Sequence, residues 1–159
     1  MSIIVLFSTV ALADQFGELE SIDAQIHGAP AFPGRVNPLS ITKKGDLRGW
    51  APTMFYEEKE LEDGVKSFLV KWPEATASGF FPTSHCCTEV VFGKLVTSSA
   101  KWTFFGLRVG DPEERVLSVL GLRARREGSL IKSCGLNDCI VFTIENGHVS
   151  EIALLLYTG

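Results

Sequence analysis

The sequence predicts an α+β fold in which a mainly antiparallel sheet carries at least one packed helix. Three observations predict it: short segments rich in β-branched and aromatic residues, turn dipeptides between them, and one sharply bounded helical segment at residues 112–121. The chain has 159 residues, of which 45% are hydrophobic, which is the size of one domain with a buried core. We expect that single domain over residues 14–159.

The first thirteen residues are predicted to be a secretory signal peptide. They carry no charge, are largely apolar apart from Ser8 and Thr9, and end in Ala11-Leu12-Ala13. Small residues in this spacing are typical of a signal-peptidase site, so we expect cleavage after Ala13 and a periplasmic or secreted protein. The segment has no positive region, which indicates a natural start upstream of Met1. A first β-strand is the alternative.

The next two segments predict a strand and then a long connection. Residues 20–26 alternate polar and apolar with period two, which is typical of a strand with one buried face. Residues 28–52 contain four prolines and four glycines, a density that interrupts regular elements. No later segment is long and apolar enough to span a bilayer.

The middle of the chain predicts four more strands. Residues 55–61 and 65–72 flank Asp63-Gly64, a dipeptide that accepts the positive φ angles of a hairpin turn. A short helix over residues 57–62 is the alternative, and the acidic side chains there lack the spacing of a calcium loop. Residues 73–82 predict a loop that carries Phe80 and Phe81. Strands are expected at 88–96 and 101–107.

One helix is strongly indicated. Asp111 suits the N-cap, Pro112 the first helical position and Glu114 a capping box. Gly121 supplies the left-handed residue that ends a helix.

The chain ends in a predicted hairpin of residues 139–144 and 148–157, turning at Asn146-Gly147. Strict pairing would set Phe142 opposite Glu151. We expect a bulge near Ser150-Glu151 that brings Ile152 opposite Phe142 instead, because a slip of one residue exchanges the two faces of a strand.

Four cysteines, Cys86, Cys87, Cys134 and Cys139, form an even set in a chain with an export signal, which predicts disulfides. Neighbouring Cα atoms are about 3.8 Å apart, too close for an undistorted Cys86–Cys87 bridge. We favour bridges from the first pair to the second. A local Cys134–Cys139 bridge with two free thiols is the alternative. Zinc is disfavoured, because neither pair has the usual two-residue separation.

Composition and motifs exclude several functions. A net charge of −4 and a pI near 5.4 argue against nucleic-acid binding. The one basic cluster, Arg123, Arg125 and Arg126, is interpreted as a solvated surface. There is no GxSxG, HExxH, phosphate-binding loop or CxxC, so we expect no cofactor and no catalysis. A thiol- or zinc-dependent enzyme that uses His85 with Cys86 or Cys87 is the alternative.

Residues 106–121, followed by the hairpin at Asn146-Gly147, resemble the repeated unit of the β-lactamase-inhibitor-protein-like and SmpA/OmlA-like secreted proteins. In those families such a helical segment precedes strands of an antiparallel sheet. The resemblance covers the last third of the chain. It implies a non-catalytic envelope protein whose sheet or loops bind another protein. A second helix is common in those families, and residues 123–130 are only a weak candidate for it.

The segment between Cys134 and Cys139 is also similar to periplasmic lysozyme inhibitors, in which a short loop closed by two cysteines plugs the target's cleft. The resemblance implies a contact loop and an envelope or extracellular protein as partner. The expected binding residues lie in this loop and in the preceding phenylalanine pair: Gly135, Leu136, Asn137, Asp138, Phe80 and Phe81.

Overall fold

The computed structural model describes residues 8–82 and 89–156. Its helices are α1 (Ser8–Gly28), α2 (Lys44–Leu47) and α3 (Glu113–Leu120), with 3₁₀ turns at Pro38–Ser40, Glu62–Gly64 and Gly121–Arg123. Its strands are β1 (Pro30–Ala31), β2 (Phe55–Glu60), β3 (Lys66–Lys71), β4 (Thr76–Phe81), β5 (Val91–Thr97), β6 (Thr103–Phe104), β7 (Arg125–Glu127), β8 (Leu130–Cys134), β9 (Cys139–Glu145) and β10 (His148–Leu155).

Eight of these strands form one antiparallel sheet in the order β2-β3-β4-β5-β10-β9-β8-β7, and β1 pairs with β6. The large sheet consists of two four-stranded meanders joined through their last strands, β5 and β10. A short helix precedes each meander, α2 before β2 and α3 before β7. The predicted α+β class with an antiparallel sheet is confirmed.

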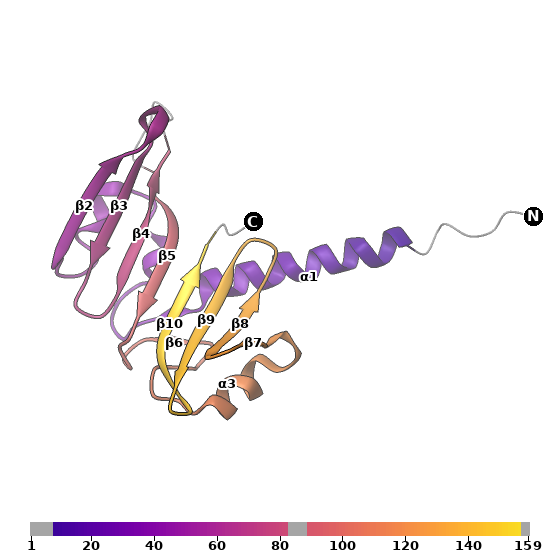
Figure 1. Cartoon of the computed structure of the whole chain (residues 1–159). Helices are drawn as coiled ribbons and strands as arrows, with labels where there is room; N and C mark the ends of the chain where they lie inside the picture. Colours follow the sequence, from indigo (N-terminus) through magenta and orange to yellow (C-terminus); the bar gives the residue numbers. More distant parts are fainter. Residues whose placement is uncertain (1–7, 83–88, 157–159) are drawn as a thin grey trace, which may run out of the picture.

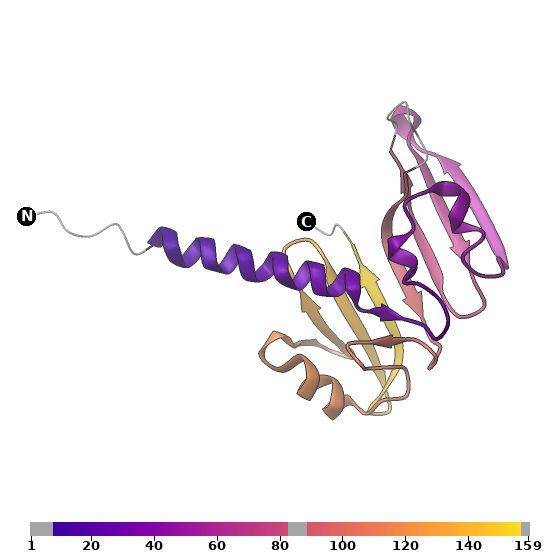
Figure 2. The ribbon, with the colours of Figure 1, turned by 180° about the vertical axis from the view of Figure 1, so that it is seen from behind.

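Helices α1 and α2 lie over the same face of the large sheet (Figures 1 and 2). Figure 1 shows the opposite face, where no described helix crosses in front of the strands. The core lies under the helical layer, and its largest fully buried side chains include Trp102, Phe104 and Phe142. One hydrophobic cluster runs beneath both meanders, because α1 contributes Ile22 and Ile26 to the same core as strand residues of both halves.

Both hairpin turns have the backbone that their dipeptides predicted. Asp63 and Gly64 have φ angles of 61° and 74°, and Asn146 and Gly147 have 52° and 76°. The bulge is also confirmed, because the register of β10 shifts between Val149 and Glu151, and Ile152 pairs with Phe142. Local turn chemistry therefore determined the register of these strands.

The prediction of a strand at residues 20–26 is wrong, because they form the last part of α1. Leu19, Ile22 and Ile26 recur three and four residues apart, so they share one helix face, and the two isoleucines are buried. The apparent period of two depended on Ala24, which is exposed.

The predicted loop over residues 73–82 is also wrong for most of its length, because residues 76–81 form β4 between β3 and β5. Further along, strand structure in residues 101–107 is limited to Thr103–Phe104. Residues 123–130 form no helix beyond the end of a 3₁₀ turn and instead supply β7 and the start of β8.

Helix α3 forms where it was expected, but its N-terminal cap differs. Pro112 occupies the cap position, and the Asp111 carboxylate instead accepts hydrogen bonds from the Arg108 backbone N–H and the Arg115 guanidinium. At the other end, Gly121 has the expected positive φ, 57°, although its ψ of −132° lies outside the left-handed helical region, and its N–H donates to the Leu117 carbonyl.

Helix α2 is held over the sheet by a polar contact within the covered layer. Lys44 Nζ lies 2.6 Å from Glu58 Oε1, which also accepts a hydrogen bond of 2.7 Å from the Tyr56 hydroxyl. The hydrogen bond from Lys44 lowers the pKa of Glu58, although burial partly opposes this, and Tyr56 adds to the lowering. Burial and the neighbouring Glu58 raise the pKa of Tyr56.

Replacing Glu58 by glutamine is expected to reduce stability by about 1 kcal/mol at neutral pH, because the side chain is partly exposed. A carboxylate with a lowered folded pKa stabilises the fold above its unfolded pKa of about 4.3 and loses this effect as pH falls through the folded value. Urea unfolding between pH 7 and pH 3 should therefore show the difference from wild type shrinking. The more exposed Glu57→Gln is the control, and an equal deficit for Glu58→Gln at every pH would contradict the assignment.

Candidate functional site

The large sheet has one covered and one open face, and alternation along each strand assigns side chains to them. In β3, Phe68 and Val70 are buried in the core, whereas Ser67 and Leu69 alternate with them and point to the open face. Strand register extends this assignment across the first meander. Two rows of paired residues then lie on the open face: Glu57, Leu69, Ser78 and Lys94, and next to them Lys59, Ser67 and Phe80.

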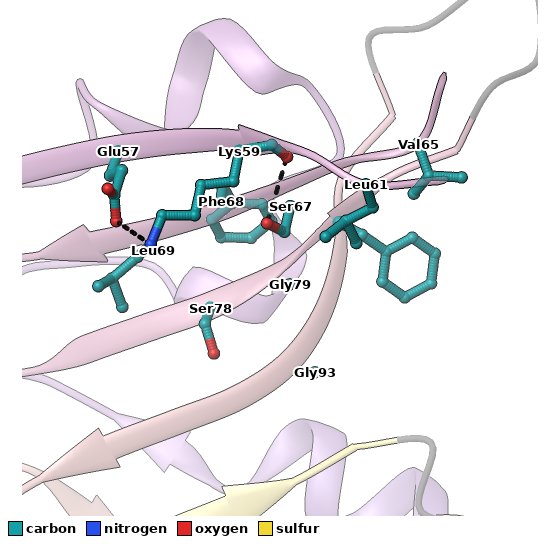
Figure 3. A pocket seen from close by; sticks show the side chains of 11 residues that line it. Glu57, Lys59, Leu61, Val65, Ser67, Phe68, Leu69, Ser78, Gly79 and Gly93 are labelled. Atoms are coloured by element: carbon teal, nitrogen blue, oxygen red, sulfur yellow. Dashed lines mark hydrogen bonds and ion pairs between the residues drawn. The ribbon is translucent and has the colours of Figure 1, made fainter. Parts of the chain in front are cut away.

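A hollow of about 640 Å³ lies on this face, over β2, β3, β4 and β5 (Figure 3). Its apolar wall includes Leu61, Leu69 and Phe80, of which Leu61 and Phe80 are 52% and 38% exposed. Charge is confined to Glu57 and Lys59, whose side chains pair with each other at 3.4 Å. The hollow can therefore accept an apolar group without leaving an unpaired charge beneath it.

A tightly packed glycine and a register shift in β4 lie beneath this hollow. A Cβ on Gly79 would meet the carbonyl oxygen of Val91 and lie 2.9 Å from the Phe68 ring. The register between β4 and β5 shifts beside this residue, between Ser78 and Gly79. Gly93 of β5 lines the hollow beside this shift and has no side chain to fill it.

The two phenylalanines singled out in the sequence point to opposite faces. Phe80 lines the hollow and is partly exposed. Phe81 is only 5% exposed, and its ring stacks on Phe68 with a centroid separation of 5.1 Å. Lys44 Nζ lies 4.9 Å from the Phe81 ring on the covered side. Phe81 thus belongs to the core, and Phe80 is the member of the pair that another molecule can reach.

Cys134 and Cys139 form a disulfide with each other. The favoured cross-links from these two residues to Cys86 and Cys87 are therefore wrong, and the local alternative is the one present. The register of β8 and β9 places the two cysteines directly opposite each other at the end of a hairpin, so a short-range bridge needs no rearrangement. Cys86 and Cys87 lie outside the described residues, as does His85.

The loop closed by this disulfide is docked on α1. The Asp23 carboxylate accepts hydrogen bonds from the backbone N–H groups of Asn137 and Asp138, both at 3.0 Å. His27 Nε2 lies 2.9 Å from Asp138 Oδ2, and Asp138 is only 3% exposed. A Cβ on Gly135 would lie 2.6 Å from the Leu19 carbonyl oxygen. The loop therefore sits directly against the helix backbone.

The four loop residues that were expected to bind a partner therefore differ in their contacts and in their exposure. Gly135, Asn137 and Asp138 all contact α1, although the Asn137 side chain is exposed, and Leu136 is exposed as well. Asp23 and His27 were not singled out in the sequence. Their four-residue spacing on one helix face was the available signal, and it was hidden by the interpretation of this segment as a strand.

The described residues contain no group of three or more His, Cys, Asp or Glu side chains that could hold a metal ion. The three clustered arginines are not a joint site, because Arg123 donates to Gln25 while Arg126 pairs with Glu113. His148 Nδ1 lies 3.0 Å from its neighbouring Asn146 carbonyl. Within the described part of the chain, no helix has the length and apolar character needed to cross a membrane.

No known protein-family model, curated protein or solved structure matches this chain.

Proposed function

We propose that this chain is an exported, non-catalytic module that binds another protein through the open face of its large sheet. The observation that carries the proposal is the hollow lined by Leu61, Leu69 and Phe80, on a face that no described helix covers. Contiguous exposed apolar surface is costly in water, and on a folded protein it is typical of an interaction site.

The hollow indicates the chemistry of the partner. The wall of the hollow is apolar, and its two charged residues, Glu57 and Lys59, pair with each other. Such a surface favours an aliphatic or aromatic side chain presented by a loop of the partner. The wall residues lie on or beside paired strands, so binding would order few side chains and lose little entropy. An envelope assembly factor, or an inhibitor that occupies another protein's surface, would use such a rigid face.

The arrangement of the two meanders supports the same proposal. Each meander follows a short helix, and the pair shares one continuous sheet. The resemblance to the β-lactamase-inhibitor-protein-like and SmpA/OmlA-like proteins implies such a helix-then-strands unit and a sheet or loops that bind protein. We infer from both that the sheet surface, more than the docked disulfide loop, makes the contact.

Export is the remaining part of the proposal. A disulfide between Cys134 and Cys139 is compatible with an oxidising compartment outside the cytoplasm. Cleavage after Ala13 would leave Leu19, Ile22 and Ile26, through which α1 joins the core, in the mature chain. The intact mass and N-terminal sequence of protein isolated from the envelope of its native host would test this, and a cytoplasmic protein that keeps Met1 would contradict it.

The binding surface is tested by Phe80→Ala, which shortens one wall of the hollow without touching the buried Phe81. Capture from envelope extract, quantified by mass spectrometry, should show at least one protein enriched by wild type. We expect that protein to be reduced roughly tenfold or more with Phe80→Ala, because loss of a central anchor typically costs about 2 kcal/mol.

Leu122→Ala is the matched control, because Leu122 is 96% exposed and lies away from the hollow in the 3₁₀ turn after α3. It should capture the same protein at wild-type level. The surface is misassigned if wild type enriches nothing, or if Phe80→Ala and Leu122→Ala behave alike while both remain folded by circular dichroism.

A further inference from the structure

Strand β2 forms one edge of the large sheet, and none of the described strands pairs with its outer side. Its ladder with β3 continues beyond the end of the strand, because the Leu61 N–H donates to the Val65 carbonyl in the same register. Backbone groups alternate in direction along an antiparallel pair. Every second residue from Leu61 back to Phe55 therefore points its N–H and C=O to β3. The residues between them point these groups outward: Tyr56, Glu58 and Glu60.

The side chains on the open face of this edge follow a self-complementary order. They are apolar, negative, positive and apolar: Phe55, Glu57, Lys59 and Leu61. Figure 3 shows the last three following one another along β2 and just beyond its end. Phe55 and Leu61, at the two ends of the row, are 45% and 52% exposed. A second copy that runs antiparallel would place an opposite charge against each charge and an apolar side chain against each apolar one.

One register satisfies both the backbone and these side chains. Outward-pointing residues must face each other to exchange hydrogen bonds, so the possible registers differ by steps of two residues. With Glu58 opposite itself, Glu57 faces Lys59 and Phe55 faces Leu61 of the second copy. One step in either direction would place Glu57 opposite Glu57, or Lys59 opposite Lys59, and like charges in these positions are destabilising. A further step would place Phe55 or Leu61 opposite a charge.

On the covered side of the sheet, the central Glu58 would face the same residue of the second copy. The Glu58 carboxylate already lies 2.6 Å from Lys44 Nζ and accepts a hydrogen bond of 2.7 Å from the Tyr56 hydroxyl. Glu60 would face Tyr56 of the second copy, whose ring centroid lies 5.2 Å from the Arg48 guanidinium carbon. Each carboxylate on this side therefore has a cation close to it, which offsets the repulsion between the two Glu58 side chains.

The other edge of the sheet is a poorer match for β2. Strand β7 has three residues, and its two arginines already have partners within the chain. Arg125 donates to the Leu122 carbonyl, and Arg126 pairs with Glu113. Pairing of β2 with β7 would also be head-to-tail, so it would leave a free edge at each end and form open chains of many copies.

We propose that two copies of this chain form a symmetric dimer by antiparallel pairing of their β2 edges, with Glu58 beside the two-fold axis. This axis is perpendicular to the sheet, so the open faces of both copies lie on the same side. The dimer goes beyond the proposed protein-binding function, because it would present two hollows on one continuous surface. One strand edge per copy makes a small interface, and we expect a Kd of about 10–100 µM.

Sedimentation equilibrium of the full chain, at concentrations that span this Kd, should fit a monomer–dimer equilibrium. Glu57→Lys and Lys59→Glu should each weaken dimerisation at least about tenfold, because each variant places like charges opposite each other across the edge. An equimolar mixture of the two variants should regain a dimer of about wild-type affinity, since every charge then faces its opposite. Loss of the pairing within one copy would not be repaired by mixing, so this result separates the dimer contact from an effect on the fold.

Lys94→Glu is the matched control, because Lys94 is an exposed lysine of the same open face but lies on β5, away from the edge. It should dimerise as wild type does, and so should Phe80→Ala, which distinguishes failure of the dimer from failure of the proposed function. All variants should keep the wild-type circular dichroism spectrum. The proposal is overturned if wild type stays monomeric, if species larger than a dimer form, if the mixture does not regain the dimer, or if Lys94→Glu weakens it as much as Lys59→Glu.

Discussion

Replacing Gly79 by alanine is expected to lower the free energy of unfolding by about 3 kcal/mol or more. The new methyl group would meet the carbonyl oxygen of Val91, which belongs to the backbone of the neighbouring strand β5. It would also lie 2.9 Å from two ring carbons of Phe68. Phe68 itself is packed between Phe81 and Phe92, so its ring has little room to move.

Gly93→Ala is the matched control, because Gly93 lies in the facing strand and its nearest contacts to a Cβ would be 3.8 Å and 3.9 Å away. Urea unfolding followed by tryptophan fluorescence should show Gly79→Ala strongly destabilised and Gly93→Ala within about 1 kcal/mol of wild type. For a chain of this length, the loss for Gly79→Ala corresponds to a decrease in Tm of roughly 6–12 °C. Equal stability of the two variants would refute the close packing of β4 against β5.

The second large effect is expected for Gly135→Ala, which should separate the disulfide loop from α1. A Cβ at this position would meet a carboxylate oxygen of Asp23 and lie 2.6 Å from the Leu19 carbonyl oxygen. The Asp23 side chain can rotate, but the helix backbone cannot. We expect a loss of about 2–3 kcal/mol, because the displaced loop also gives up the hydrogen bonds of Asn137 and Asp138 to a charged acceptor.

Amide hydrogen exchange at Asn137 and Asp138 measures this loss locally, and both amides should exchange faster in Gly135→Ala. The control is Gly17→Ala on α1, where an added Cβ would have nothing within 4 Å. In an exposed helix interior, alanine is favoured over glycine by about 1 kcal/mol, so this variant should be unchanged or more stable. Unaltered exchange in Gly135→Ala would mean that the loop does not depend on α1.

Turns, one helix and one bulge could be predicted from the sequence alone. The turns could be predicted because their dipeptides, Asp63-Gly64 and Asn146-Gly147, accept positive φ angles that most residues avoid. Gly121 ended α3 for the same reason. The bulge before Ile152 followed from matching apolar residues across a hairpin whose turn was already known. In each case the controlling interaction lies within a few residues along the chain.

The residues of the candidate sites could be predicted from the sequence only in part. Phe80 could be named but not distinguished from Phe81, because adjacent residues of a strand face opposite sides and residues 76–81 were expected to be a loop. Cys134 could be named, but its partner depended on the register of β8 and β9. The clustering of Trp50, Trp72 and Trp102 had no sequence signal, since the three rings come from segments far apart in the chain.

Residues 20–26 show what the sequence determines by itself and what only the tertiary structure decides. Its apolar positions fit both a strand and a helix, and its sequence determined only that one face would be buried. The tertiary structure decided for a helix, because Leu19, Ile22 and Ile26 together reach the core while Asp23 receives the backbone N–H groups of the disulfide loop. Those partners lie more than a hundred residues further along the chain. Contacts over that distance stabilise one of two locally similar conformations, and no local pattern contains them.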